Sequence, residues 1–574
     1  MAEDSRGVKR KLHGRAFYES IGSPKYVLAP MVDQSEYAWR LLTRSFMPPS
    51  EQSSLLCYSP MFHARLFSEK PKYRDTHFQP FKGAWPERPQ NSTATLPQDA
   101  HLDGNPQNDR PLFVQFCANE PEPFLSAALA VAPYCDAVDL NLGCPQGIAK
   151  RGNYGAFLQE DWSTISSLIQ TLHEKLPIPV TAKMRVLETK EKTLEYAKMI
   201  LDSGASILTV HGRRREQKGH NTGLADWGFI RHLRENLPKD TVLFANGNIL
   251  QHGDIQRCLE ATGADGVMSA EGNLYDPTIF ARPPETGQEG REYWRGKDGK
   301  GGYRVDAVLR RYMDIIWRDV LGKDPPARRP LFVPGDPLED LSKVANDDDV
   351  QDHADDARVD GPPAKKKQKR SDARKAQTTK PEKEQSPNMT AMQAHLFHLL
   401  RPLVGKHTNV RDKLARTRAG DLEGYETILS MVEAAVTEGL MEQVEQEGDA
   451  EGDTKGTAID VEAVGDQIDD TTSSTAAVER CKRPWFIVQP YVRPLPEEAI
   501  EKGALQLSKK ERRRREIEQE EAKKACLAPQ GKIEEVPVME QPSSGSSGQD
   551  AEGKGGAETT QEKVEVPREG LVCG

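Results

Sequence analysis

The stretch Val138-Asp139-Leu140-Asn141-Leu142-Gly143-Cys144-Pro145-Gln146 decides how the rest of the chain is interpreted. Its apolar, β-branched start breaks at Gly143, a pattern typical of a buried strand that enters a loop. This places Cys144 at the carboxyl end of a strand, where loops gather around ligands in α/β folds. Because most buried cysteines only pack, the meaning of Cys144 depends on the sequence around it.

Seven further apolar runs of this kind occur, and helical patterns separate them. Eight buried strands that alternate with helices are typical of a (β/α)8 barrel, also called a TIM barrel. An open doubly wound sheet is the alternative, but it usually has a Gly-rich turn after its first strand, where this chain has Ala29-Pro30-Met31. We therefore predict a TIM barrel with strands at 26–31, 54–58, 111–116, 137–142, 179–186, 206–211, 241–247 and 265–270.

The domain organisation follows from changes in composition along the chain. We expect a barrel at 24–283, interrupted by a surface insertion at 72–109 and preceded by a disordered N-terminus at 1–23. Helical periodicity then returns twice, so we predict one α-helical domain split by a charged, disordered insert. The predicted parts after the barrel are the helical domain at 284–335 and 389–440, the insert at 336–388, an acidic linker at 441–478, a docked apolar segment at 479–500, and a charged helix with a disordered tail at 501–574.

Charge and cysteine usage limit the partners and the compartment. The net charge of −10 excludes a uniformly basic nucleic-acid binder but not basic patches. The eight cysteines include no C-x-x-C pair, so we expect reduced thiols in a cytoplasmic or nuclear protein. No apolar run approaches membrane-spanning length, and we expect a monomer without a membrane partner. The basic run 365–370 could be a nuclear localisation signal, an RNA-binding arm or linker charge.

Polar side chains stand at the predicted strand ends, where barrel enzymes carry their sites. They bring amide, imidazole and cationic groups to one mouth with almost no acid, which suits an electron-rich, anionic ligand. Turns at Gly247 and Gly272 leave backbone N–H groups at the usual barrel phosphate site, so a phosphorylated ring cofactor fits. No Asp/Glu/His cluster predicts a metal. The strand-end residues are Gln115, Asn141, Lys183, Arg185, His211, Asn246 and Asn248.

Seven motifs follow one another across the barrel: LAPMVD at 28–33, VQF at 114–116, DLNLGCPQ at 139–146, AKMR at 182–185, LTVHGR at 208–213, ANGN at 245–248 and GVM at 266–268. In their order and spacing the chain resembles the FMN-dependent tRNA-dihydrouridine synthases. The segment 268–274 departs from the bacterial pattern, which has an Arg where this chain has Asn273. This segment and 148–152 resemble the eukaryotic branch that acts on uridines 16 and 17 of the tRNA D loop.

The resemblance implies that the chain reduces uridine in tRNA with FMN as its cofactor and NADPH or NADH as the reductant. Hydride would pass from the flavin to C6 of the uracil, and Cys144 would donate the proton that C5 then needs. An unperturbed thiol has a pKa of about 8.5 and is mostly protonated at neutral pH, which suits an acid. The basic helical segment after the barrel matches the tRNA-binding domain of the family.

The resemblance also implies cofactor contacts at the strand ends. Pro30, Met31 and Val32 would pack under the flavin ring. Gln115 and Lys183 would meet its polar edge, where positive charge stabilises the reduced, anionic flavin. The remaining implied contacts, to the flavin or its phosphate, are His211, Asn246, Gly247, Asn248, Ala270 and Glu271.

Binding of tRNA would depend on phosphate contacts from clustered Lys and Arg, and the target uracil would have to leave the tRNA fold. The implied substrate contacts at the mouth are Asn141, Lys150, Arg151, Arg185, Arg213, Arg214 and Arg215. Further candidates in the helical domain are Arg310, Arg311, Arg411, Lys413 and Arg416.

Two rival functions remain open at this point. The first is another FMN barrel oxidoreductase that acts on a small molecule, which the basic helical domain disfavours. The second is a tRNA-binding protein without catalytic activity, which Cys144, Lys183 and His211 disfavour. The sequence also leaves open which of the two uridines is preferred and whether NADH or NADPH is used.

Overall fold

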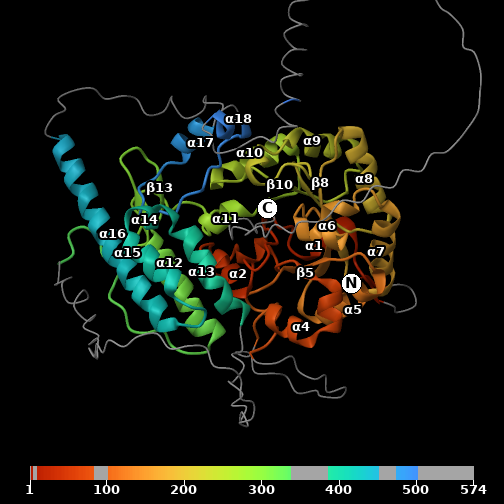
Figure 1. Cartoon of the computed structure of the whole chain (residues 1–574), viewed down its shortest axis with the longest axis horizontal. Coiled ribbons are helices and arrows are strands. Elements are labelled where there is room, and N and C mark those ends of the chain that lie inside the picture. Colours follow the sequence, from red (N-terminus) through yellow and green to blue (C-terminus); the bar gives the residue numbers. More distant parts are fainter. Residues whose placement is uncertain are drawn as a thin grey trace, which may run out of the picture. The chain divides into compact units, whose positions relative to one another are not determined.

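The computed structural model describes residues 2–3, 9–82, 101–337, 386–451, 474–501 and 513 (Figure 1). The chain divides into two compact units. The first, residues 1–494 with 572–574, holds the barrel and the helical domain. The second, residues 495–571, is described only at helix α18 (Pro496–Glu501) and residue 513, so the charged helix predicted near 509–524 lies almost wholly outside the described residues.

Eight parallel strands close into a barrel, which confirms the predicted fold. The strand β3 pairs with β4 and β11, and β4 also pairs with β6, which completes the ring. Nearly all strand residues are buried, because side chains fill the inside and helices cover the outside; this explains the continuous apolar runs. The strands are β3 (Tyr26–Leu28), β4 (Leu55–Tyr58), β6 (Leu112–Cys117), β7 (Ala137–Leu142), β8 (Val180–Arg185), β9 (Leu208–His211), β10 (Leu243–Asn246) and β11 (Gly266–Ser269), with the short β5 (Phe62–His63) beside β6.

Helices surround the barrel and pack against their neighbours in chain order. Side-chain caps fix where several begin: Asp161 accepts from the N–H of Thr164, and Asp226 accepts from that of Gly228. The outer helices are α2 (Tyr37–Ser45), α3 (Ala64–Glu69), α5 (Pro121–Val131), α7 (Trp162–Lys175), α8 (Lys190–Asp202), α9 (Trp227–Asn236) and α10 (His252–Thr262), and the short α6 (Gly147–Gly152) and α11 (Glu271–Tyr275) follow β7 and β11.

Part of the N-terminus predicted to be disordered is folded, so the prediction for 1–23 is wrong there. Helix α1 (Gly14–Ser20) buries Phe17 and Tyr18 in the barrel core. The Tyr18 hydroxyl donates to the carbonyl oxygen of Asp265 at 3.1 Å, and Arg15 pairs with the carboxylate of Asp265 at 2.6 Å. The helix is only seven residues long, which is too short to show a clear amphipathic period in the sequence.

Both ends of the predicted surface insertion at 72–109 are also folded. Helix α4 (Pro71–His77) occupies its start. At its end, Asp103 and Asp109 are buried against Arg40 of α2, at 2.7 Å and 2.5 Å from Nη2 of the guanidinium. Burial raises the pKa of Asp103 to about 6 despite this partner. The end of the insertion is therefore part of the core, and residues 83–100 lie outside the described residues.

A helical domain follows the barrel, and it includes segments from both sides of the predicted insert. Helix α13 begins at Pro387, so the last residues assigned to the insert are helical, and 338–385 lie outside the described residues. Within the part of the chain that the structure describes, none of the helices combines the length and apolar character needed to cross a bilayer. The helices are α12 (Val305–Ile315) with its π-turn η6 (Ile316–Val320), α13 (Pro387–Leu399), α14 (Arg401–Lys406), α15 (Thr408–Arg416) and α16 (Leu422–Glu451).

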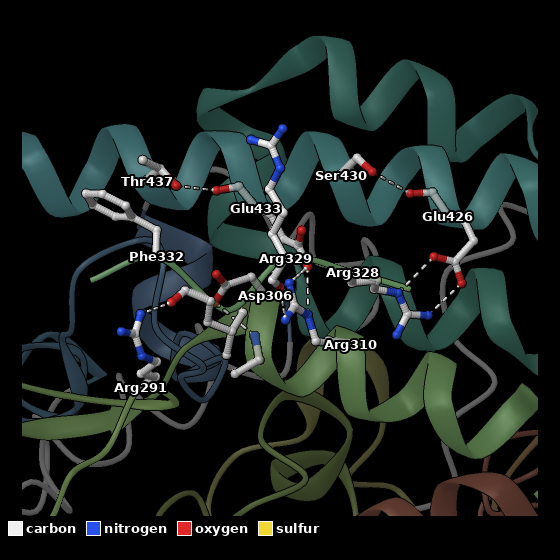
Figure 2. A network of polar contacts seen from close by, with 12 residues as sticks. Arg291, Asp306, Arg310, Arg328, Arg329, Phe332, Glu426, Ser430, Glu433 and Thr437 are labelled. Carbon is white, nitrogen blue, oxygen red and sulfur yellow. Dashed lines mark hydrogen bonds and ion pairs between the residues drawn. The ribbon is translucent and has the colours of Figure 1, made fainter. Parts of the chain in front are cut away.

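Arginines hold α12 and the segment after it against α16. Figure 2 shows Arg310 of α12 directed at Glu433, and Arg328 directed at Glu426, both on α16. The N–O distances are 2.5 Å and 2.7 Å. Arg311 bonds the carboxylate of Glu292 and the carbonyl oxygen of Ser45. Arg310 and Arg311, both expected at the RNA, thus stabilise the helical domain and its contact with the barrel.

The helical domain shares a core with the barrel through α2. The His395 ring of α13 stacks on Trp39 at 3.8 Å between centroids, with an interplanar angle of 1°. Its Nε2 atom lies 3.1 Å and 3.0 Å from the two carboxylate oxygens of Glu36. The side chain of Asn388 accepts from the backbone N–H of Ala38 at 2.9 Å. These contacts fix α13 on the outside of the barrel.

The apolar segment after helix α17 (Ser474–Cys481) packs into the core of the first unit. We call residues 483–493 the C-terminal strap. The N–H of Val488 donates to Tyr303 of strand β13 (Gly301–Tyr303) at 2.9 Å, and Phe486 accepts from Val305 at 3.0 Å. Strand β13 pairs with β12 (Tyr293–Arg295) in a small hairpin. The strap therefore crosses from the helical domain toward the barrel.

Replacing Arg40 with Met should lower the free energy of unfolding by about 3–5 kcal/mol, because two buried carboxylates lose their cation. Chemical denaturation followed by circular dichroism measures this change. The matched control is Arg231→Met, since Arg231 pairs with Glu235 at 2.7 Å on the exposed face of α9. That pair is worth less than about 1 kcal/mol. Equal losses in the two variants would contradict a structural role for the end of the insertion.

Candidate active site

The loop that follows β7 holds Cys144 in one position. The side-chain oxygen of Asn141 accepts from the N–H of Gly143 at 3.1 Å and from that of Cys144 at 2.8 Å. The carbonyl oxygen of Cys144 accepts from Ala156 at 3.1 Å. Gly155 has φ +64°, and a Cβ there would lie 2.9 Å from that carbonyl oxygen, so only glycine fits. Cys144 is 1% exposed and its thiol is shielded from bulk water.

A chain of buried polar groups beneath the loop orients Asn141. Asp139 accepts from the Thr181 hydroxyl at 2.6 Å and from the side-chain amide of Gln115 at 2.9 Å. The oxygen of Gln115 then accepts from the amide of Asn141 at 2.8 Å. An ionised carboxylate can only accept, so Asp139 fixes both amides with their oxygens toward the mouth. Burial raises the pKa of Asp139 to about 6, while the hydrogen bonds from Thr181 and Gln115 and the charge of Lys183 act in the opposite direction.

This arrangement gives two predicted site residues a positioning role, while their contacts to cofactor and substrate stay predictions. Gln115, expected at the edge of a cofactor, is bonded on both sides within the barrel, so it positions Asn141. Asn141, expected to contact substrate, in turn positions the Cys144 loop. Neither Asp139 nor Thr181 is predicted as a site residue from the sequence. The signal that could have found them is a polar side chain within an otherwise apolar, fully buried strand, because such a group needs a partner.

Arg185 at the end of β8 fastens two loops together. Its Nε donates to the carbonyl oxygen of Gly143 at 2.7 Å, and its Nη1 donates to that of Arg214 at 3.2 Å. It is 5% exposed, as is Lys183 two residues before it. The structure therefore supports a positioning role for Arg185, and it brings Lys183 to the same strand end beside Asn141.

His211 at the end of β9 is neutral and has an unfilled hydrogen bond. Burial, with the positive charges of Arg185, Arg213 and Lys183, holds its pKa well below the usual range. Its Nε2 lies 3.1 Å from Nη1 of Arg213 and must accept, so Nδ1 carries the proton. This Nδ1, like the side-chain oxygen of Asn246 on the next strand, is buried without a hydrogen-bond partner. Adjacent unsatisfied groups of this kind indicate a place for a ligand.

The rim above β10 and β11 is tightly packed at Gly247 and carries cationic side chains. Gly247 has φ +117°, and a Cβ there would lie 2.5 Å from the Cβ of Ala225. Asn248 accepts from Nη2 of Arg213 at 3.2 Å, and the carboxylate of Glu271 pairs with Arg493 of the C-terminal strap at 2.5 Å. Ala270, which precedes Glu271, is buried at the end of β11. The predicted phosphate-side residues thus lie on two neighbouring strand ends, as expected for barrel strands seven and eight.

The remaining predicted cofactor residues form the turn after β3. Pro30 and Met31 are buried and Val32 is partly exposed. The Ser35 hydroxyl bonds both the N–H and the carbonyl oxygen of Met31, at 3.0 Å and 3.1 Å, and so fixes this turn. Asn273, where the chain departs from the bacterial pattern, faces inward and accepts from the indole N–H of Trp39 at 2.8 Å.

The predicted RNA contacts are not one patch. Arg213 is bonded inward to His211 and Asn248, and Arg215 pairs with Glu160 at 2.6 Å. Within the cluster 213–215, Arg214 is exposed and the other two arginines are partly buried. Lys150 and Arg151 are exposed on α6, directly after the Cys144 loop, and Arg411, Lys413 and Arg416 are exposed on α15.

Replacing Asn141 with Ala should raise the alkylation rate of Cys144 by iodoacetamide about tenfold or more, because two loop N–H groups lose their acceptor and each such loss costs about 1–3 kcal/mol. Mass spectrometry of the peptide that contains Cys144 measures the rate. The control is Asn236→Ala, at an exposed position of α9. An unchanged rate in the Asn141 variant would mean that Arg185 and Ala156 hold the loop without it.

Comparison with known proteins gives the family. Residues 27–297 match the family described as "Dihydrouridine synthase (Dus)". The chain is 40% identical to the "tRNA-dihydrouridine(16/17) synthase [NAD(P)(+)]" of Schizosaccharomyces pombe, over 85% of this chain and 92% of that protein. It is 41% identical to the Saccharomyces cerevisiae protein of the same name, over 76% of this chain and 80% of that protein. With this identity over nearly the full length of a curated relative, the chain belongs to the dihydrouridine synthase family.

Proposed function

We propose that the chain reduces the C5–C6 double bond of uridines 16 and 17 in the D loop of tRNA, with FMN as its cofactor and NAD(P)H as the reductant. Two relatives that align with 85% and 76% of the chain bear the name of this activity. The observation that carries the proposal is the placement of Cys144. A nearly buried thiol is held by a fixed hydrogen-bond chain at the mouth of a barrel whose other strand ends are cationic and partly unsatisfied.

The mouth fits FMN. The Nδ1–H of His211 and the side-chain oxygen of Asn246 are buried and lack partners, and a flavin phosphate ester offers both acceptors and donors. Gly247 lets the backbone beside Asn248 pack closely on Ala225, and the rim carries positive charge from Arg213. Pro30, Met31 and Val32 supply an apolar turn on which a flat ring can lie.

Bound FMN, once reduced by NAD(P)H, supplies the hydride for C6 of the uracil. Lys183 places an ammonium group at the end of β8, where it would stabilise negative charge on a reduced flavin. Cys144, nearly buried in a fixed loop after β7, is the acid that would hold the proton for C5. Asp139, Gln115 and Asn141 keep that thiol in place, and Arg185 ties its loop to the loop after β9.

The tRNA reaches the mouth by its phosphates, and the target uracil leaves its stack to enter. Exposed cations are available to the phosphates at two places: Lys150, Arg151 and Arg214 in the segments that follow β7 and β9, and Arg411, Lys413 and Arg416 on α15. Arg213, Arg215, Arg310 and Arg311 bond to other groups of the protein, so we exclude them from the contacts to tRNA phosphates.

Replacing Cys144 with Ala should keep flavin binding and lower dihydrouridine formation about a hundredfold or more, because a positioned acid contributes roughly 10²–10⁴ in rate. The measurement is the visible absorption spectrum under anaerobic conditions. In the unchanged protein, NADPH should bleach the flavin bands and unmodified tRNA should restore them. In the Cys144 variant, NADPH should still bleach the bands, but tRNA should restore them far more slowly.

The matched control is Cys258→Ala, a buried cysteine of α10 away from the mouth, which should behave as the unchanged protein does. Bleached bands that ignore tRNA but respond to free uracil compounds would favour the small-molecule oxidoreductase. A protein that binds tRNA but never shows flavin bands, even with FMN added, would overturn the proposed reaction.

A further inference from the structure

The C-terminal strap ends beside the barrel mouth, at the helix that follows β11. Nε and Nη2 of Arg493 lie 3.0 Å and 2.5 Å from the carboxylate oxygens of Glu271, the first residue of α11. The Tyr491 ring lies 5.6 Å from that of Tyr275 in the same helix, and the guanidinium of Arg401 covers it at 3.8 Å. Arg493 thus lies at the rim of the predicted cofactor site, although 222 positions separate it from Glu271 in the sequence.

The strap is anchored independently of Arg493. Phe486 and Val488 are buried and bond to the backbone of the helical domain and of β13. Arg483 donates to the carbonyl oxygen of Gly301 at 3.1 Å. The guanidinium of Arg493 is therefore not required to dock the strap, and its approach to Glu271 calls for another explanation.

The rim brings two guanidiniums, those of Arg213 and Arg493, close to one carboxylate, that of Glu271. Arg213 makes its hydrogen bonds to neutral acceptors, namely His211, Asn248 and the carbonyl oxygen of Gly223. Burial and then the positive charge of Arg185 lower its pKa to about 10, and Arg493 acts in the same direction. Glu271 acts in the opposite direction, but it is already paired with Arg493. Among the described residues, Arg213 therefore shares its nearest carboxylate with Arg493 and hydrogen-bonds only neutral acceptors, which favours an anion beside it.

The position of this charge points to the kind of anion. Arg213 follows β9, its partner Asn248 follows β10, and Glu271 follows β11. The loops after the seventh and eighth strands are where barrel folds bind phosphate. The nearby unsatisfied Nδ1 of His211 and the glycine at 247 belong to the same part of the mouth. A phosphate monoester satisfies all of these requirements, since it brings up to two negative charges.

We propose that Arg493 of the C-terminal strap, together with Arg213, binds the phosphate of FMN, so that the strap is a working part of the cofactor site. The inference rests on the proposed FMN cofactor. Glu271 then holds the Arg493 guanidinium in position before the phosphate arrives. The strap joins the helical domain, through Trp485 and Arg401, to the place where the cofactor is retained.

The test compares FMN with riboflavin, which has the same ring but no phosphate. Full-length protein stripped of flavin is titrated with each, and quenching of flavin fluorescence gives the two Kd values. Arg493→Ala should weaken FMN binding about tenfold, as expected for one charge-assisted hydrogen-bonded contact, and leave riboflavin binding unchanged. Arg493→Lys, which keeps the charge, should recover most of the preference for FMN. The control is Arg483→Ala, which removes an anchor of the same strap to Gly301 and should alter neither Kd.

The outcomes distinguish a failure of the proposed phosphate contact of Arg493 from a failure of the proposed FMN cofactor. If Arg493→Ala weakens FMN and riboflavin equally, or leaves FMN unchanged, the phosphate contact is overturned while FMN remains the cofactor. Equal loss of FMN in the Arg483 variant would overturn it as well, because docking alone would then explain the effect. If the unchanged protein binds neither flavin, the cofactor proposal fails together with this one. Thermal unfolding of each variant checks that the fold is intact.

Discussion

The site depends on the buried carboxylate of Asp139, a group that can only accept hydrogen bonds when ionised. Because Asp139 accepts, the amide of Gln115 must direct its N–H groups at Asp139 and its oxygen at Asn141. The amide of Asn141 must then direct its oxygen at the backbone N–H of Cys144, so each amide has one allowed orientation. Because these groups come from neighbouring strands of a closed barrel, none can turn without leaving another buried group unsatisfied. The thiol position is therefore set by the barrel interior, and the loop itself contributes little freedom.

The barrel could be predicted because parallel strands covered on both faces give continuous apolar runs, and eight such runs in alternation with helices have few other arrangements. The segments that were misassigned lack such a run. Residues 101–109 are polar, and they enter the core only because Arg40, far away in the chain, neutralises Asp103 and Asp109. Composition predicts a surface loop for such a segment, since it cannot show a partner that the fold supplies.

The sequence predicts which residues form the candidate site better than it predicts what each residue does there. Strand-end position alone brought Cys144, Lys183, His211 and Asn246 together, and the structure places them at one mouth. Strand-end position could not distinguish a side chain that faces the mouth from one that bonds to the protein itself. Arg185 is of the second kind, because its Nε donates to the carbonyl oxygen of Gly143. Arg493 had no local signal, because only the path of the strap brings it to Glu271.

Helix α2 belongs to the barrel and to the helical domain at once, and this bears on how the two can be separated. Trp39 and Glu36 are covered by His395, which comes from α13. A barrel cut out at residue 297, where the family match ends, would present an indole and an unpaired carboxylate to solvent on one helix. The two domains are therefore poor modules for exchange between relatives, and a chimera would have to carry α2 and α13 together.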